Sequence, residues 1–216
     1  MWKTIMPGKS FADRKGVRLA MLLLNLVPLL HAAATIACIL SPYPWLAPAV
    51  LYLAPLIPGR ILRETLRSSP PEIAIGSSAF LRWWACFQCQ ALFLRFPALE
   101  ELLRLVPGIY SLWLRLWGSR IGALTYWAPG TIILDRGFLE IGDKVVFGAG
   151  VRINPHVMEN NSLLLAPVKI GDDAMIGGYS LLTAGTEIAA GEATRAFLIS
   201  PPFSKWKNGK RSRNPL

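Results

Sequence analysis

The fold is decided by the stretch IGDDAMIGGYSLLTAGTEI, residues 170–188, in which a large aliphatic side chain returns at every sixth position. These side chains are Ile170, Ile176, Leu182 and Ile188, and glycine directly follows the first two. A large side chain at every sixth residue can fill the axis of a triangular coil, while glycine and other small residues permit tight corners. The stretch therefore predicts a coil in which three hexapeptides make one turn.

The same period extends from this stretch toward the N-terminus. The residues that carry it there are Ile121, Trp127, Ile133 and Leu139 and, after the phase resets at Ile141, also Phe147 and Ile153. Residues 159–169 break the period, so we expect a loop that projects from the coil directly after His156. The repeat region is predicted to span residues 120–196, and residues 197–216 form a basic C-terminal tail.

The chain is both apolar and basic. Hydrophobic residues make up 53% of its 216 residues and charged residues 17%, whereas an ordinary soluble domain carries roughly a quarter charged residues. The formal net charge of +10 would attract either nucleic acid or an anionic lipid surface. The positive mean hydropathy favours lipid, so we expect a membrane protein that does not bind nucleic acid.

About 40 consecutive residues between Arg18 and Arg60 carry no Asp, Glu, Lys or Arg. At roughly 1.5 Å per residue, this length comes close to crossing a hydrocarbon core of roughly 30 Å twice. Residues 19–59 are therefore predicted to form a transmembrane helical hairpin that turns at the two prolines in 41–44. A shallow re-entrant hairpin is the alternative, because the second arm is short and rich in proline. Basic residues in 1–18 and after Arg60 place both flanks in the cytoplasm.

Residues 60–119 are rich in Leu, Phe and Trp and carry isolated arginines. Such helices can lie in the plane of the membrane interface, and Pro107-Gly108 predicts a break between two of them. Buried helices of a globular core are the alternative. The expected location is a bacterial inner membrane, with the repeat region on the cytoplasmic side.

Ile-Gly-Asp repeats with a lone histidine before an extruded loop resemble the hexapeptide-repeat acyltransferase superfamily. A closer resemblance is to the membrane-bound C-terminal module of epsilon-poly-lysine synthetase-type proteins, which are related to nonribosomal peptide synthetases. It rests on FLRWW at 80–84, on LRLWGSRIG at 114–122, and on the interval from His156 to Ile170-Gly171. It covers roughly residues 79–200. The chain departs from those proteins because its residues include neither an adenylation nor a carrier domain, which leaves the acyl donor open.

The resemblance implies an α+β membrane protein in which membrane helices precede a left-handed parallel β-helix. It also implies an acyltransferase that moves an acyl or aminoacyl group from a thioester to an amine or hydroxyl of an amphipathic acceptor, with amide formation favoured. The thioester would belong to coenzyme A or to the phosphopantetheine of a carrier protein, and no permanently bound cofactor is expected. A homotrimer is implied because hexapeptide enzymes usually bind substrates between neighbouring coils.

His156 is the only histidine in the repeat region and is the candidate general base, because imidazole titrates near neutral pH. The resemblance adds Glu159 as a carboxylate that would stabilise the charged imidazole. Asn154, Asn160 and Asn161 are candidates for holding the acceptor.

Further substrate contacts are expected from the repeat region and the tail. The backbone at Gly177 and Gly178 is a candidate oxyanion donor, and Tyr179 beside it is a candidate substrate contact. Lys205 and Lys207 are expected to contact phosphate or pantetheine of the donor, with solvated disorder of the basic tail as the alternative.

We predict no metal site, because no second cysteine pair or nearby histidine completes the spacing of Cys86 and Cys89. His31 lies in the first apolar segment and is expected to pack as a neutral, hydrogen-bonded side chain, although a substrate path is the alternative. Two rival functions are kept. One is a non-catalytic trimeric membrane scaffold in which His156 is incidental, and the other is a transporter subunit.

Overall fold

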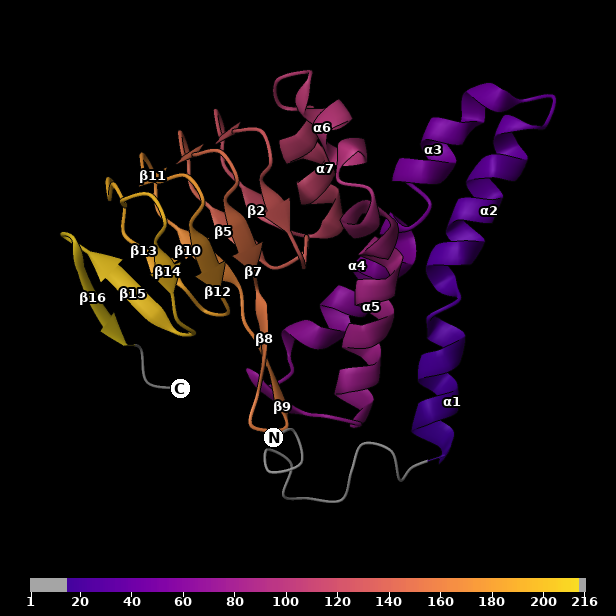
Figure 1. The fold of residues 1–216 in the computed structure, drawn as a ribbon, viewed down its shortest axis with the longest axis horizontal. Helices are drawn as coiled ribbons and strands as arrows, with labels where there is room; N and C mark the ends of the chain where they lie inside the picture. Colours follow the sequence, from indigo (N-terminus) through magenta and orange to yellow (C-terminus); the bar gives the residue numbers. More distant parts are fainter. Residues whose placement is uncertain (1–14, 214–216) are drawn as a thin grey trace. The chain divides into compact units, whose positions relative to one another are not determined.

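The computed structural model describes residues 15–213, so most of the expected basic segment 1–18 lies outside the described residues. The chain divides into two compact units (Figure 1). The first comprises residues 15–92 and 158–163, and the second comprises residues 93–157 and 164–213. This division differs from the expected boundary at residue 120, because the last two helices before the coil pack with it in one unit.

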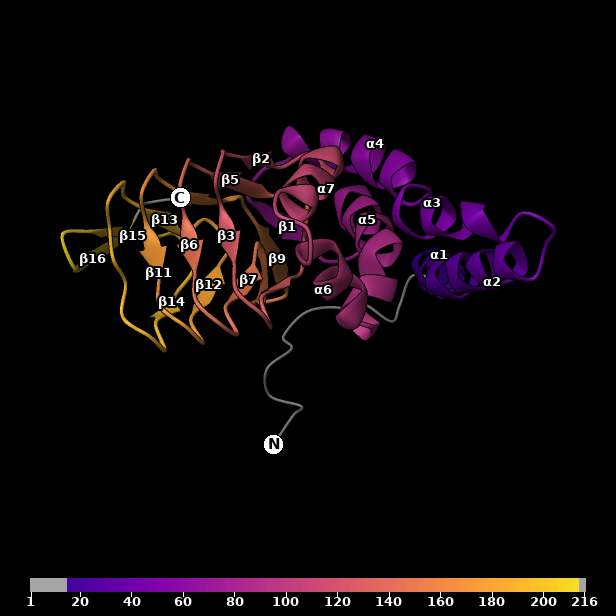
Figure 2. The ribbon, with the colours of Figure 1, turned by 90° about the horizontal axis from the view of Figure 1, so that it is seen from above.

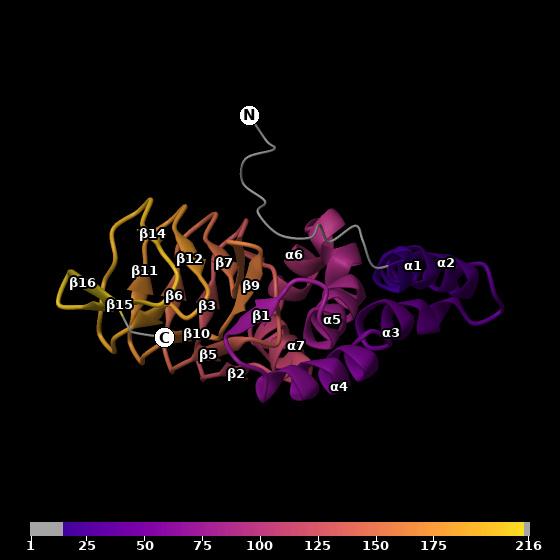
Figure 3. The same cartoon turned by 90° about the horizontal axis from the view of Figure 1, so that it is seen from below.

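The first unit is largely helical. Its elements are α1 (Lys15–Leu24), α2 (Val27–Ile39), the 3-10 helix η2 (Pro44–Leu46), α3 (Ala47–Tyr52), α4 (Leu56–Arg67), the short strand β1 (Glu72–Ala74) and most of α5 (Ser78–Arg95). Helices α2 and α3 lie side by side (Figure 3). Between them, Ser41 Oγ donates to the carbonyl of Cys38 and accepts from the backbone N–H of Tyr43. The chain therefore reverses at the predicted turn.

Two stretches of the first unit are long and apolar enough to cross a membrane, namely Gly16–Ile39 and Pro44–Arg67. The first is not buried within the protein, and only about a fifth of the second is. Signal sequences pass the same test of length and composition, as do the buried core helices of soluble proteins. Helix α2 carries no Asp, Glu, Lys or Arg and is largely exposed, which is compatible with lipid contact, whereas α4 carries arginines and a glutamate.

Side-chain hydrogen bonds hold the helices of the first unit together where they are interrupted. Asn25 lies between α1 and α2, and its Oδ1 accepts hydrogen bonds from Trp84 Nε1 at 3.1 Å and Gln88 Nε2 at 2.8 Å. His31 Nε2 lies 3.0 Å from the carbonyl oxygen of Leu51, near the end of α3. This contact is what a hydrogen-bonded packing role for His31 requires.

The second unit begins with the end of α5 and two short helices, α6 (Ala98–Arg104) and α7 (Ile109–Trp117). Gly108 precedes α7 with φ of 85°, a left-handed conformation that favours glycine, so the predicted break is observed. One face of α7 is buried within the unit. Its buried residues are Tyr110, Ser111, Trp113, Leu114 and Trp117. The burial of this face fits the alternative of buried core helices better than the prediction of a helix in the membrane interface.

The predicted repeat forms a coil of three parallel sheets. Their orders are β2-β5-β10-β13-β15, β3-β6-β11 and β4-β7-β12-β14 (Figures 1 and 2). The strands are β2 (Arg120–Ile121), β3 (Tyr126–Trp127), β4 (Ile132–Ile133), β5 (Leu139–Ile141), β6 (Val146–Phe147), β7 (Arg152–Asn154), β10 (Val168–Ile170), β11 (Met175–Ile176), β12 (Leu181–Thr183), β13 (Glu187–Ile188), β14 (Ile199–Ser200) and β15 (Ser204–Lys207). Each turn of the coil adds strands to these sheets, so neighbours in a sheet come from successive turns.

The periodic side chains stack inside the coil, as the sequence predicts. In the first sheet Ile121, Ile141 and Ile170 are in register, followed by Ile188. In the second sheet the ring of Trp127 stacks on that of Phe147, with centroids 4.4 Å apart. All of these side chains are buried. Burial of one large apolar side chain per hexapeptide therefore stabilises successive turns against each other.

The predicted loop after His156 is a β-hairpin made of β8 (His156–Glu159) and β9 (Ser162–Leu165). Asn160 and Asn161 connect its strands with φ of 48° and 63°. Two consecutive residues with positive φ are typical of a tight hairpin turn, and asparagine tolerates that conformation. The tip of the hairpin, residues 158–163, belongs to the first unit, where β9 pairs with β1.

The expected basic tail is folded through Arg213, and the coil does not end at residue 196. Trp206 on β15 is in register with Ile188, so it continues the stack of periodic side chains. The antiparallel strand β16 (Lys210–Arg213) then pairs with β15. Asn208 and Gly209 connect them with φ of 53° and 69°, which an Asn-Gly hairpin turn requires. Residues 197–213 are therefore folded, and the alternative of solvated disorder is wrong for them.

Candidate active site

The second unit brings a histidine and a carboxylate together. His156 Nδ1 lies 2.5 Å from Asp135 Oδ2. Asp135 follows β4 and His156 follows β7, and these strands pair with Ile133 opposite Ile153. The two side chains therefore meet because they occupy neighbouring positions in successive turns of the coil. Asp135 is 2% exposed and His156 15%, so the pair is largely shielded from water.

The surroundings of His156 shift its pKa in two opposite directions. Burial lowers the pKa because it disfavours the charged imidazolium. The negative charge of Asp135 and its hydrogen bond raise the pKa, and these effects prevail, so the pKa lies above the ordinary value of 6.5. A carboxylate at Nδ1 also fixes the orientation and tautomer of the ring, which makes Nε2 the basic nitrogen.

The carboxylate that contacts His156 is Asp135, and not Glu159, the residue that the family resemblance indicated. Both His156 and Glu159 lie on β8, three positions apart. Successive side chains of a strand point to opposite faces, so these two positions do not share a face. Glu159 is exposed. Asp135 is 21 residues away in sequence, and only the register of the coil could have indicated it.

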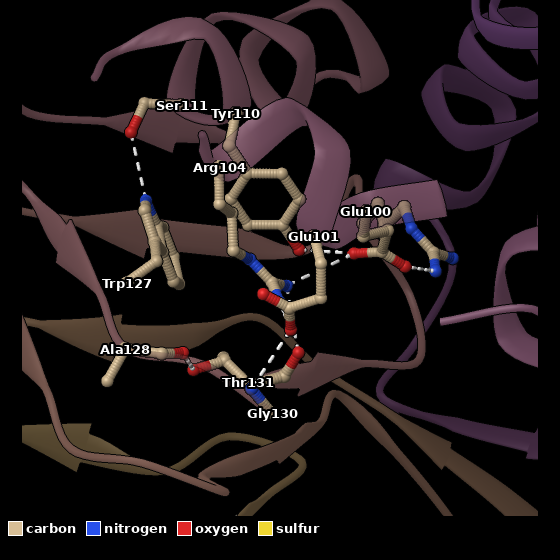
Figure 4. Close-up of polar contacts among 10 residues, drawn as sticks. Glu100, Glu101, Arg104, Tyr110, Ser111, Trp127, Ala128, Gly130 and Thr131 are labelled. Atoms are coloured by element: carbon tan, nitrogen blue, oxygen red, sulfur yellow. Dashed lines mark hydrogen bonds and ion pairs between the residues drawn. The ribbon is translucent and has the colours of Figure 1, made fainter. Parts of the chain in front are cut away.

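The backbone next to Asp135 is fixed by a buried polar network. Arg136 is fully buried and forms an ion pair with Glu100 of α6. Its carbonyl accepts a hydrogen bond from Ser119 Oγ at 2.6 Å. The hydroxyl of Tyr110 donates to Glu100 (Figure 4), and burial raises the pKa of Tyr110, which keeps it protonated. The network attaches α6 and α7 to the turn of the coil that carries Asp135.

The three predicted asparagines occupy different environments. Asn154 lies on β7, two residues before His156, and its Oδ1 is buried without a hydrogen-bond partner among residues 15–213. Such an oxygen can accept a hydrogen bond from a bound molecule. Asn160 and Asn161 lie at the hairpin tip in the first unit, and their positive φ angles explain both residues without a ligand.

Gly177 and Gly178, the predicted oxyanion donors, form hydrogen bonds within the coil. The N–H of Gly177 donates to Thr194 Oγ1 at 3.0 Å, so it is not the open donor that an oxyanion requires. The carbonyl of Gly178 accepts from the N–H of Phe197. The ring of Tyr179 is exposed and stacks on that of Phe197, with centroids 5.4 Å apart and planes inclined by 11°.

Lys205 and Lys207 lie on β15 with their side chains exposed. Lys205 Nζ lies 3.5 Å from Glu187 Oε2, and Lys207 is opposite Lys210 in the terminal hairpin. They therefore form part of an ordered basic hairpin. Within the described part of the chain, no group of three or more His, Cys, Asp and Glu side chains is arranged to hold a metal ion.

No protein-family model and no curated protein matches the chain. Among solved structures, a hexapeptide-repeat-containing acetyltransferase from Vibrio cholerae is similar over 57% of this chain and 90% of its own, with 19% identity and a TM-score of 0.37. Maltose O-acetyltransferase from Clostridium difficile 630 matches over 53% and 82%, with 16% identity and a TM-score of 0.25. Serine acetyltransferase isoform 3 from Entamoeba histolytica matches over 90% and 82%, with 12% identity and a TM-score of 0.24. Similarities at this level do not assign an activity.

Proposed function

We propose that the protein is a membrane-bound acyltransferase of the hexapeptide-repeat superfamily, with a left-handed coil. It moves an acyl or aminoacyl group from a thioester to an amine or hydroxyl of an amphipathic acceptor. The observation that carries the proposal is the 2.5 Å hydrogen bond between His156 Nδ1 and Asp135 Oδ2 beside a hairpin that projects from the coil. A buried carboxylate that orients an imidazole is the arrangement of a general base. The resemblance to synthetase modules ranks an amine ahead of a hydroxyl.

In the proposed reaction, Nε2 of neutral His156 takes a proton from the acceptor nitrogen or oxygen while that atom attacks the thioester carbonyl carbon. The carbonyl electron pair moves to oxygen and forms a tetrahedral oxyanion. When this intermediate collapses, the carbon–sulfur bond breaks and the leaving thiolate takes the proton from the imidazolium. Asp135 stabilises the imidazolium between these two steps. A positioned base of this kind accelerates such reactions by roughly 10²- to 10⁴-fold.

Asn154 is proposed to bind the acceptor. Its buried Oδ1 has no partner among the described residues, and leaving a buried acceptor unsatisfied costs free energy. An N–H or O–H group of the acceptor would satisfy it two residues before His156. Lys205 and Lys207 are proposed to attract the phosphates of coenzyme A or the phosphopantetheine of a carrier protein, because both side chains are exposed and cationic.

The membrane location is part of the proposal and is supported by the two apolar stretches of the first unit. We place the protein in a bacterial inner membrane with the coil on the cytoplasmic side, where the positive-inside rule puts its basic flanks. A homotrimer is proposed from the family resemblance.

Thioester consumption by the purified full chain in detergent tests the proposal, with acyl-coenzyme A donors, amine or alcohol acceptors, and products identified by mass spectrometry. We expect His156→Ala and Asp135→Asn to lose most turnover. Glu159→Gln is the matched control, because this exposed carboxylate on the same strand should be dispensable. Product formation that survives His156→Ala at the wild-type rate would remove His156 as the base. If coenzyme A thioesters are not consumed, the same comparison is made with acyl-carrier protein.

A further inference from the structure

Helix α7 has apolar side chains on two faces, and only one of them is covered by the second unit. Tyr110, Trp113 and Trp117 are buried, whereas Leu112 and Leu116 are about half exposed. The exposed residues continue onto α6 and the connecting turn. Together they form the α6–α7 face, which consists of Leu102, Leu105, Val106, Ile109, Leu112 and Leu116. Six exposed apolar side chains on two consecutive helices and their connecting turn are typical of an interaction site.

The α6–α7 face cannot turn inward without breaking the buried polar network. Glu100 of α6 pairs with the fully buried Arg136, and Arg104 donates to the carbonyl of Thr131 at 2.8 Å. Ser111 of α7 accepts a hydrogen bond from Trp127 Nε1 at 2.9 Å (Figure 4). These bonds connect both helices to the first turns of the coil. The leucines are therefore held outward by the fold, because burying them would leave charged groups without partners.

The charges beside the α6–α7 face favour phospholipid as its partner. Arg115 lies beside Leu116 on α7 and is exposed, and its guanidinium donates hydrogen bonds to the carbonyls of Ile121 and Gly122. Helix α7 contains no acidic residue, and Glu101 of α6 is occupied by an ion pair with Arg104. Exposed leucines with a cationic side chain and no acidic residue on the same helix suit the boundary between acyl chains and phosphate headgroups. The same chain also carries two stretches that could span a membrane.

We propose that the α6–α7 face is a membrane-docking surface that rests in the interfacial region of a phospholipid bilayer. It would hold the catalytic unit against the membrane in addition to the helical hairpin. A cavity of about 450 Å³ adjoins this part of the unit and is lined by Val106, Tyr110, Leu124 and Trp127, among others. The proposal extends the proposed membrane location, and it does not depend on acyl transfer.

A photo-crosslinking amino acid, introduced one position at a time into the full chain, tests this surface in vesicles of phosphatidylcholine and phosphatidylglycerol. The test positions are Leu105 and Leu112. Leu29 on α2 is the control for lipid contact of the hairpin, and Ile199 on β14 is an equally exposed apolar control on the coil. All four side chains are exposed, so replacement should not disturb the fold, and unchanged unfolding temperatures verify this.

We expect lipid adducts at Leu105 and Leu112 with yields comparable to Leu29, and a yield at least about tenfold lower at Ile199, because the exposed coil lies outside the bilayer. Adducts to protein at Leu105 and Leu112 would show that a second copy or another helix of the chain covers the face, and would overturn the proposal. Missing adducts at these positions, with lipid adducts at Leu29, would overturn it as well and leave the hairpin in the membrane. Equal lipid adducts at Ile199 would also overturn it. None of these outcomes depends on turnover. The crosslinking result therefore stands whether or not the protein transfers acyl groups.

Discussion

His156 and Asp135 form a pair whose chemistry depends on burial. The carboxylate is nearly inaccessible to water, so its charge is poorly screened and acts strongly on the adjacent ring. Burial alone would lower the pKa of His156, and Asp135 reverses this effect. The imidazole is therefore a stronger base than it would be without its partner, and it is also held in one orientation.

The pH dependence of turnover should report this balance. Only neutral His156 accepts a proton, so kcat/KM is expected to rise with pH through a midpoint above 6.5, the ordinary pKa of the ring. In Asp135→Asn the raising effect of the charge is removed while burial remains, so the midpoint of the residual activity should move to lower pH. Profiles of kcat/KM against pH for both proteins measure this. An identical midpoint in the variant would show that Asp135 does not set the basicity of His156.

Only part of this site could be predicted from the sequence. His156 could be, because it is the single histidine of the repeat region and precedes the break in the period. Asp135 could not, because its proximity depends on the pairing of Ile133 with Ile153 across a turn in which the hexapeptide phase is reset. Glu159 was favoured because the family resemblance indicated it, but alternation along β8 turns it to the other face.

At the scale of the coil, glycines determine how closely successive turns approach. A Cβ on Gly177 would lie 2.3 Å from the backbone carbon of Arg195, whereas a Cβ on Gly178 would meet nothing nearer than the carbonyl oxygen of Ala149 at 3.1 Å. Gly177→Ala is therefore expected to lower the free energy of unfolding by about 1–3 kcal/mol, the usual cost of overpacking. Gly178→Ala is the matched control and should lose less. Denaturant titration in detergent measures both, and equal losses would contradict a packing role specific to Gly177.

The ion pair between Glu100 and Arg136 connects α6 to the coil. Both residues are buried, so Glu100→Gln removes a buried carboxylate charge that pairs with the Arg136 guanidinium. We expect this change to reduce the free energy of unfolding by about 3–5 kcal/mol. Glu187→Gln is the control, because Glu187 pairs with the half-exposed Lys169 and Lys205 on the coil surface and its loss should cost about 0–1 kcal/mol. Similar unfolding midpoints for the two variants would contradict a stabilising role of the buried pair.

Elements with a local signal were predictable, and those fixed by distant contacts were not. The six-residue period identified the side chains that stack inside the coil, and Pro107-Gly108 identified the break before α7. The terminal hairpin was missed although Asn208-Gly209 is a hairpin signal, because the basic charge of the segment suggested disorder. The buried face of α7 was missed because Leu and Trp are equally suited to a protein core and to a membrane interface.

On the scale of the whole molecule, the boundary between the two units depends on contacts that the sequence does not display. Residues 60–119 have one composition, yet the chain divides after Leu92. Residues beyond that point join the coil because Glu100 and Ser119 bond to Arg136. Residues 158–163 join the helical unit through the pairing of β9 with β1. Both sets of contacts join residues that are far apart in the chain. Periodicity and hydropathy describe neighbouring residues and therefore do not predict such contacts.

The proposed path of the hairpin through a membrane can be tested at its turn. The stretch Gly16–Ile39 contains 24 residues, and a helix of that length reaches roughly 36 Å, enough to cross a hydrocarbon core of roughly 30 Å. We therefore expect Ser41, in the turn, to lie on the side of the membrane opposite the coil. In a chain in which Cys38, Cys86 and Cys89 are replaced, Ser41→Cys should react with a membrane-impermeant maleimide added to intact cells, whereas Lys207→Cys should react only after the cells are opened. Protection of Ser41→Cys in intact cells and its labelling from the cytoplasmic side would instead establish the re-entrant hairpin.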